Sequence, residues 1–136
     1  MKLVNVNLIA RDIAVLCEFY RTLFGFQELM ARRTAIYRCL NAGASELGFN
    51  AWGAYELLQL AGRAPAAAPA PVTAYCTFAA PDCAAVDALV RRCVELGGST
   101  VRPAMVTHYN AYQAVLADPE CNVFRVQSPA GAKETA

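Results

Sequence analysis

The sequence predicts an α+β protein with two β-α-β-β-β modules in tandem, forming two curved four-stranded mixed sheets, each with one helix outside. A strand-like stretch, an Asp and an amphipathic helix occur in that order twice, about half a chain apart, and each helix stops at glycine. A repeat of this size indicates two copies of one module rather than a solenoid. The modules are expected at 1–60 and 72–128, with an Ala/Pro linker at 61–71 and a flexible tail at 129–136.

The first copy of the repeat runs from Leu3 to Gly25. Residues Leu3–Ala10 alternate with period two, which predicts a strand with one apolar face. Asp12 suits a helix N-cap because its carboxylate can accept hydrogen bonds from the free amides of the first turn. Gly25 fits the left-handed residue that ends such a helix. The helix itself is indicated by an apolar stripe, which comprises Ile13, Leu16, Cys17, Tyr20, Leu23 and Phe24.

The second copy repeats these signals. Thr73–Ala80 alternates in the same way, Asp82 is the matching N-cap, and Gly97 and Gly98 close the helix. Its apolar stripe comprises Val86, Leu89, Val90, Cys93 and Leu96.

The remaining strands follow from the same alternation. In the first module they are predicted at Phe26–Arg33, Thr34–Asn41 and Ser45–Asn50, and Ala51–Leu60 is expected to be a loop or short helical turn. In the second they are predicted at Ser99–Val106, Ala111–Ala117 and Val123–Gln127, with turns at 108–110 and 118–122.

Composition excludes several classes of protein. Net charge is +1, only 17% of residues are charged, and no basic run exceeds a pair, so no nucleic-acid or membrane partner is expected. The pairs Arg32-Arg33 and Arg91-Arg92 are expected at a strand edge and on a solvated helix face, without a functional role. The apolar runs are too short for a membrane helix, which predicts a cytoplasmic protein. A hydrophobic content of 57% favours a homodimer.

The six cysteines show no C-x-x-C pair and no zinc spacing. We therefore expect reduced cysteines that pack in the core, with Cys17, Cys76 and Cys93 on buried faces.

Polar residues occupy the strand faces that the helices leave uncovered. They could form a solvated face or line a binding cavity, and the scarcity of Lys and Glu among them favours the cavity. Trp52 is either a packing anchor or a further lining residue. The polar face comprises Asn5, Asn7, Glu46, Asn50, Thr73, Tyr75, Arg125 and Gln127.

Two motifs resemble a known family. The first is D-I-x-x-L-x-x-F-Y-x-x-L-F-G-F from Asp12 to Phe26, and the second is D-P-E-C-N-V-F-R from Asp118 to Arg125. With the tandem modules, they resemble the vicinal oxygen chelate superfamily, over about residues 3–128. Its members include glyoxalase I, extradiol dioxygenases, fosfomycin-modifying enzymes and bleomycin-binding resistance proteins. The resemblance implies that the modules surround a funnel-shaped cavity.

In the metal-dependent members of that superfamily, a His on the first strand and a Glu on the last strand of each module hold an ion. By motif, the two His positions fall on Asn5 and Tyr75 in this sequence. The two Glu positions fall on Glu46 and Arg125, so only Glu46 keeps the usual ligand. A guanidinium stays protonated and has no acceptor, so Arg125 would repel a cation. We therefore expect neither a metal nor another cofactor; the one histidine, His108, lies in a turn off the matched strands.

The leading hypothesis is a metal-independent small-molecule-binding protein that sequesters an antibiotic or metabolite, as bleomycin resistance proteins do. The alternative is a glyoxalase-like lyase or isomerase, or a dioxygenase-related enzyme, acting on a small carbonyl or enol substrate, with Glu46 as base and Arg125 as electrophile. A third is an interaction domain without a ligand. In the ligand-free pocket Glu46 is expected to pair with Arg125. The predicted binding residues are Asn5, Asn7, Glu46, Asn50, Trp52, Tyr75 and Arg125.

Overall fold

The computed structural model describes residues 1–131, so residues 132–136 of the predicted tail lie outside the described residues. The chain divides into two compact units, Met1–Ala67 and a second that begins at Ala68. The boundary falls within the Ala- and Pro-rich stretch 61–71. Each unit is described by itself.

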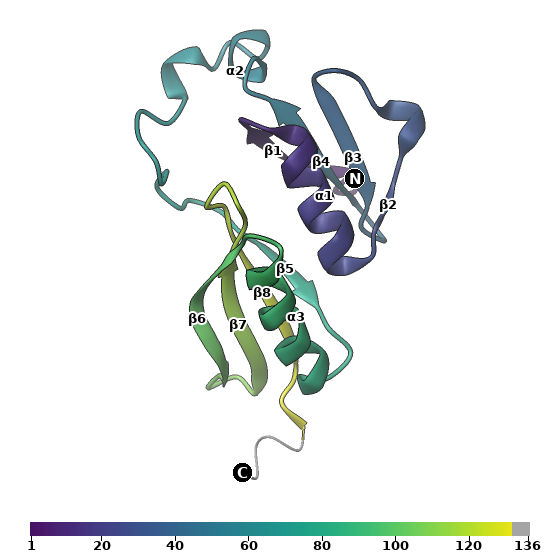
Figure 1. Cartoon of the computed structure of the whole chain (residues 1–136), viewed down its shortest axis with the longest axis vertical. Helices are drawn as coiled ribbons and strands as arrows, with labels where there is room; N and C mark the ends of the chain where they lie inside the picture. Colours follow the sequence, from purple (N-terminus) through teal and green to yellow (C-terminus); the bar gives the residue numbers. More distant parts are fainter. Residues whose placement is uncertain (132–136) are drawn as a thin grey trace. The chain divides into compact units, whose positions relative to one another are not determined.

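Unit 1 consists of one sheet and one long helix (Figure 1). Its elements in chain order are β1 (Asn5–Ala10), α1 (Ile13–Phe24), β2 (Gln27–Glu28), the 3-10 turn η1 (Met30–Arg32), β3 (Tyr37–Asn41), β4 (Glu46–Ala51), α2 (Ala54–Leu57) and the 3-10 turn η2 (Ala61–Arg63).

Helix α1 begins and ends as the sequence predicts. The Asp12 carboxylate accepts hydrogen bonds from the backbone amides of Ala14 and Val15, at 3.1 and 3.0 Å. Gly25 ends the helix at φ 71°, the left-handed region in which glycine is favoured. These local signals set the bounds of α1 without help from the rest of the fold.

The sheet of unit 1, called sheet 1, has the strand order β1-β4-β3-β2. Strands β1 and β4 are parallel, and the other neighbours are antiparallel, so the sheet is mixed as predicted. Helix α1 lies on one of its faces, where the Tyr20 ring stacks on that of Phe49 with centroids 5.8 Å apart. The core between α1 and sheet 1 includes Leu16, Cys17, Phe19, Tyr20, Leu23, Leu40, Leu47 and Phe49.

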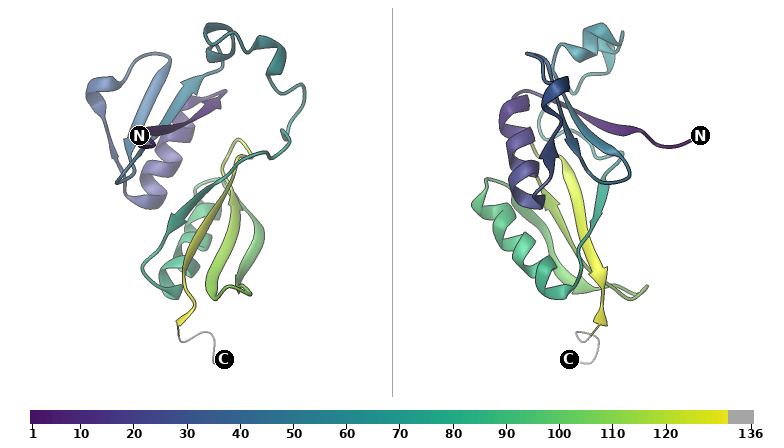
Figure 2. Two further views of the ribbon diagram at one scale, coloured as in Figure 1. Left: turned by 180° about the vertical axis from the view of Figure 1, so that it is seen from behind. Right: turned by 90° about the vertical axis from the view of Figure 1, so that its right-hand side faces the viewer.

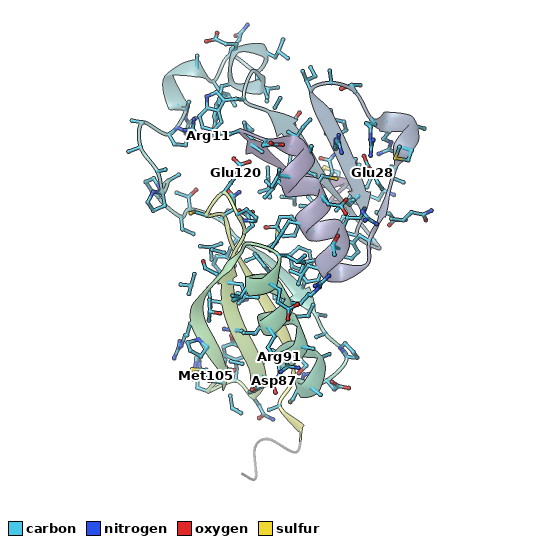
Figure 3. The ribbon with its side chains drawn as sticks, viewed as in Figure 1. Arg11, Glu28, Asp87, Arg91, Met105 and Glu120 are labelled. Carbon is cyan, nitrogen blue, oxygen red and sulfur yellow. The ribbon has the colours of Figure 1, made fainter. Side chains whose placement is uncertain are left out.

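The predicted strand Phe26–Arg33 is wrong for most of its length. Only Gln27–Glu28 pairs with β3, and the chain then enters η1. The Arg33 guanidinium makes two hydrogen bonds to the buried carboxylate of Glu28, at 2.8 and 2.5 Å, and so turns the chain back. Glu28 is labelled beside β2 in Figure 3. Strand β3 accordingly starts at Tyr37, three residues later than expected.

Unit 2 repeats the arrangement of unit 1. Its elements are β5 (Cys76–Ala79), α3 (Cys83–Glu95), β6 (Ser99–Val106), β7 (Ala111–Ala117) and β8 (Val123–Pro129). Asp82 caps α3 by accepting from the backbone amide of Ala85 at 2.8 Å, as predicted. Strands β6 and β7 have the predicted bounds.

The sheet of unit 2, called sheet 2, has the order β5-β8-β7-β6, with β5 parallel to β8 and the other neighbours antiparallel. Helix α3 covers one of its faces, as both views in Figure 2 show. On that side the Tyr112 hydroxyl donates to the Asp87 carboxylate of α3 at 2.7 Å. The predicted class, α+β with two four-stranded mixed sheets, is thus confirmed. In the described chain, no helix has the length and apolar character that a membrane span needs.

The expectation that the cysteines pack in the core holds for three of the six, since Cys83 is half-buried and Cys121 is exposed. Cys17 and Cys93 are buried, whereas Cys76 is half-buried because β5 is an edge strand of sheet 2. Cys39, which had no assigned place, is fully buried. All six are free thiols in the structure.

Candidate functional site

The face of sheet 1 opposite α1 carries the polar residues that the sequence indicates. Asn5 lies beside Glu46 in the strand register, and Asn7 lies beside Gly48. Asn50, also on this face, lies beside Tyr37. Four of the seven predicted binding residues therefore share one surface, called the sheet 1 polar face. Its members are Asn5, Asn7, Tyr37, Cys39, Glu46, Gly48 and Asn50.

Gly48 allows two side chains to converge at the centre of this face. A Cβ atom at position 48 would lie 2.0 Å from Asn7 Oδ1 and 2.9 Å from the Tyr37 hydroxyl. The Asn7 amide is held there by a hydrogen bond from Nδ2 to Asn5 Oδ1 at 3.1 Å. The missing side chain thus lets polar groups from β1 and β3 meet across β4.

Glu46 has a cationic partner that the sequence analysis did not assign. Arg32, from η1, donates to Glu46 Oε2 and forms an ion pair with it. The Cys39 thiol donates to the same oxygen at 3.6 Å. Within unit 1 the charge of Glu46 is therefore balanced by Arg32. Arg32 and Arg33, which were expected at a strand edge, lie in and directly after η1, and each forms an ion pair.

The phenol of Tyr37 and the thiol of Cys39, next to Glu46 on this face, are held in their neutral forms. Burial, with a hydrogen bond to Cys39, raises the pKa of Tyr37 to about 12. Burial likewise raises the pKa of the Cys39 thiol. Near neutral pH both residues can therefore serve as uncharged hydrogen-bond donors.

Sheet 2 presents a second polar surface, centred on Arg125 of β8. The Arg125 guanidinium donates from Nε to Thr77 Oγ1 at 2.9 Å and from Nη1 to the Tyr109 hydroxyl at 3.4 Å. Its Cζ atom lies 4.8 Å from the ring centroid of Tyr75. The Tyr109 hydroxyl donates in turn to Gln113 Oε1 at 2.6 Å. We call this set, with Gln127 on the same side of β8, the sheet 2 polar face.

Arg125 differs from Glu46 in how its charge is balanced. Within residues 1–131, Arg125 forms no ion pair with a carboxylate, and its polar partners are hydroxyl groups. Hydroxyls orient a guanidinium without neutralising it, so the positive charge stays available to an anionic oxygen.

The donor set does not fit a divalent metal. Among the described residues, no three His, Cys, Asp or Glu side chains cluster closely enough to hold an ion. Of the four positions matched to metal ligands, one is the cation Arg125 and another, Glu46, is already paired with Arg32. Several neutral imidazoles or carboxylates converging on one point would be needed.

Trp52 lies directly after β4 and has a different environment. The Arg11 guanidinium lies 4.2 Å from the centroid of the Trp52 ring, and the Tyr55 ring meets it edge-on with centroids 5.0 Å apart. These contacts suit the packing interpretation of Trp52.

Residues of two kinds on these faces were not predicted from the sequence. Tyr37, Cys39 and Gln113 lie on predicted strands, and the alternation of those strands could have identified them. Arg32 and Tyr109 lie in η1 and in the β6–β7 turn, where no periodic signal indicates the direction of a side chain.

Comparison with known proteins identifies one family model over most of the chain. A glyoxalase-like domain matches residues 4–127. A search of the curated proteins finds no match.

Solved structures agree with the family model. A glyoxalase/bleomycin resistance protein/dioxygenase family enzyme from Burkholderia phytofirmans PsJN is 40% identical, covers 95% of this chain and 99% of its own, and has a TM-score of 0.89. A glyoxalase-related enzyme from Fulvimarina pelagi is 19% identical over 93% of this chain and 87% of its own, with a TM-score of 0.76. A fosfomycin resistance protein from Mesorhizobium loti is 15% identical over 99% and 98%, with a TM-score of 0.68. The last two similarities concern the fold alone.

Proposed function

We propose that this chain, which belongs to the glyoxalase-like family of the vicinal oxygen chelate superfamily, is a metal-independent small-molecule-binding protein. Its ligand would be an antibiotic or a metabolite that the protein sequesters. The observation that carries the proposal is the environment of Arg125, a cation oriented by hydroxyl groups and not balanced by a carboxylate within the described residues.

The chemistry of the ligand follows from Arg125. A guanidinium binds a carboxylate or another oxyanion through two parallel hydrogen bonds, and it also donates to carbonyl or enol oxygens. The exposed Tyr75 ring next to it offers flat apolar contact. We therefore expect a small, partly apolar ligand that carries an anionic oxygen.

The enzymatic alternative receives less support. A lyase or isomerase that uses Glu46 as a general base needs that carboxylate free to take a proton from the substrate. The ion pair with Arg32 and the thiol hydrogen bond from Cys39 occupy it instead. The proposal is accordingly a binding protein, with turnover as an outcome to be tested.

Binding can be tested with benzoate, an aromatic carboxylate, by calorimetry on the protein before and after treatment with a chelator. Arg125→Ala should weaken binding at least about tenfold, which is ~1.4 kcal/mol. Arg91→Ala is the matched control, because Arg91 is exposed on α3, as labelled in Figure 3. Equal affinity in wild type and Arg125→Ala, or binding that disappears with the chelator, would contradict the proposal.

The proposal extends to assembly and location. The hydrophobic content of 57% supports a homodimer, and the net charge of +1 with no basic run beyond a pair supports a protein without a nucleic-acid or membrane-surface partner. We also expect the protein in the cytoplasm. Light scattering at micromolar concentration tests the dimer, and a solely monomeric protein would contradict it.

A further inference from the structure

The side-chain oxygen of Gln127 is a buried acceptor on the sheet 2 polar face. Gln127 Oε1 is shielded from solvent and has no hydrogen-bond partner in the described chain. Gln127 lies two residues after Arg125 on β8, so both side chains leave the same face of the sheet. Because nearly all buried acceptors in native proteins are paired, this oxygen requires an explanation.

The neighbours of Gln127 in the sheet leave this oxygen unpaired. On one side its register partner is Ala79 of β5, which carries only a methyl group. On the other side the partner is Gln113 of β7, whose side-chain oxygen accepts from Tyr109 and whose amide nitrogen, although a donor, makes no hydrogen bond to Gln127 Oε1. The next residue in that row is Met105, labelled on β6 in Figure 3, which has no donor.

A donor and an acceptor site are thus placed along one strand. Arg125 offers charged donors without an opposing carboxylate, and Gln127 offers an unused acceptor. Residues two apart on a strand are about 6.5 Å apart. One small molecule can span that separation.

We infer that the ligand is a small acid that also carries a hydroxyl or N–H donor, with its anionic oxygens on Arg125 and its donor on Gln127 Oε1. This inference rests on the proposed function and adds a second anchor to it. Gln127 as a whole is only half-buried, so its amide can turn toward a ligand on this face, and the bound ligand would satisfy the oxygen that the described chain leaves unpaired. An acid without a donor would leave that acceptor unpaired on binding and would bind more weakly.

Two probes of similar size test the inference: 4-hydroxybenzoate, which has a donor opposite its carboxylate, and 4-fluorobenzoate, which has none. Calorimetry on the wild-type protein should show at least about tenfold tighter binding of 4-hydroxybenzoate. Gln127→Met, which keeps the approximate shape but removes the acceptor, should abolish that preference. Gln27→Met, on the exposed edge strand β2, is the matched control and should keep the preference for 4-hydroxybenzoate.

The outcomes separate the two proposals. Equal affinity of the two acids in wild type, with both weakened by Arg125→Ala, would overturn the inference and leave the proposed function standing. Binding of neither acid, or binding independent of Arg125, would overturn both. If Gln127→Met does not fold, Gln127→Ala takes its place, and a preference that survives removal of the acceptor would also overturn the inference.

Discussion

Replacing Gly48 by alanine tests whether side chains, rather than backbone, set the close contact at the centre of the sheet 1 polar face. The new methyl would lie 2.0 Å from Asn7 Oδ1 and 2.9 Å from the Tyr37 hydroxyl. Both atoms end flexible side chains, and Asn7 is exposed, so it can turn to another rotamer. That turn loses the hydrogen bond to Asn5, which is worth about 0.5–1.5 kcal/mol.

A second contribution of the substitution increases the free energy of unfolding. Alanine in the interior of a strand is more favourable than glycine by about 0.5–1 kcal/mol, because glycine loses more conformational freedom on folding. The two contributions nearly cancel. We therefore expect Gly48→Ala to change the free energy of unfolding by no more than about 1 kcal/mol.

A double-mutant cycle measured by urea unfolding checks this reasoning. In an Asn7→Ala background the main clash is absent, so Gly48→Ala should stabilise the protein by about 0.5–1 kcal/mol. Tyr37→Phe, which removes only the hydroxyl, is the control for the second contact. A loss of more than about 3 kcal/mol in both backgrounds would show that the backbone itself cannot accept a methyl, and the argument would fail.

Two further predictions concern stability. Cys121 has φ 66°, so Cys121→Gly should raise the free energy of unfolding by about 0.5–1 kcal/mol, whereas Asn110→Gly at φ 65° should change it little because Asn tolerates that region. Burial raises the pKa of the Cys17 and Cys93 thiols from 9 to about 11, so their neutral forms are favoured by the fold. The stability that this preference confers is complete below pH 9 and is lost as the pH rises to about 11. Urea unfolding across that range should therefore show a falling free energy of unfolding. The fall should be the same in Cys121→Ala and smaller in Cys93→Ala.

The fold could be predicted largely because the residues that begin and end its helices act locally. Asp12 and Asp82 each accept hydrogen bonds from backbone amides two or three residues away, and Gly25 ends α1 through its own backbone conformation. Such signals depend on neighbours in sequence, so the chain reveals them directly. The apolar alternation likewise assigned the faces of β4 and β8 correctly.

The segment after α1 could not be predicted from local patterns. Its alternation is compatible with a strand from Phe26 to Arg33, yet pairing stops at Glu28. The chain enters η1 instead, where Arg32 pairs with Glu46 and Arg33 pairs with Glu28. The first of these pairs joins residues 14 apart and is therefore invisible to a pattern that compares near neighbours.

The candidate sites follow the same division between strands and loops. Strand alternation placed Asn5, Asn7, Glu46, Asn50 and Arg125 on the polar faces. It could not identify what each charge would meet, because the partners come from loops: Arg32 from η1 and Tyr109 from the β6–β7 turn.

The two repeats thus carry opposite charges at the two positions that match the family's Glu ligands, and within the described residues only one of these charges is balanced by an ion pair. Glu46 in unit 1 meets a cation from a neighbouring loop, whereas Arg125 in unit 2 meets hydroxyl groups. A ligand that engages Glu46 must displace Arg32, while a ligand that engages Arg125 displaces no carboxylate within the described residues. The displaced partner adds an unfavourable term to binding in the first case. An anionic ligand should therefore select unit 2, and its affinity should depend on Arg125 far more than on Glu46.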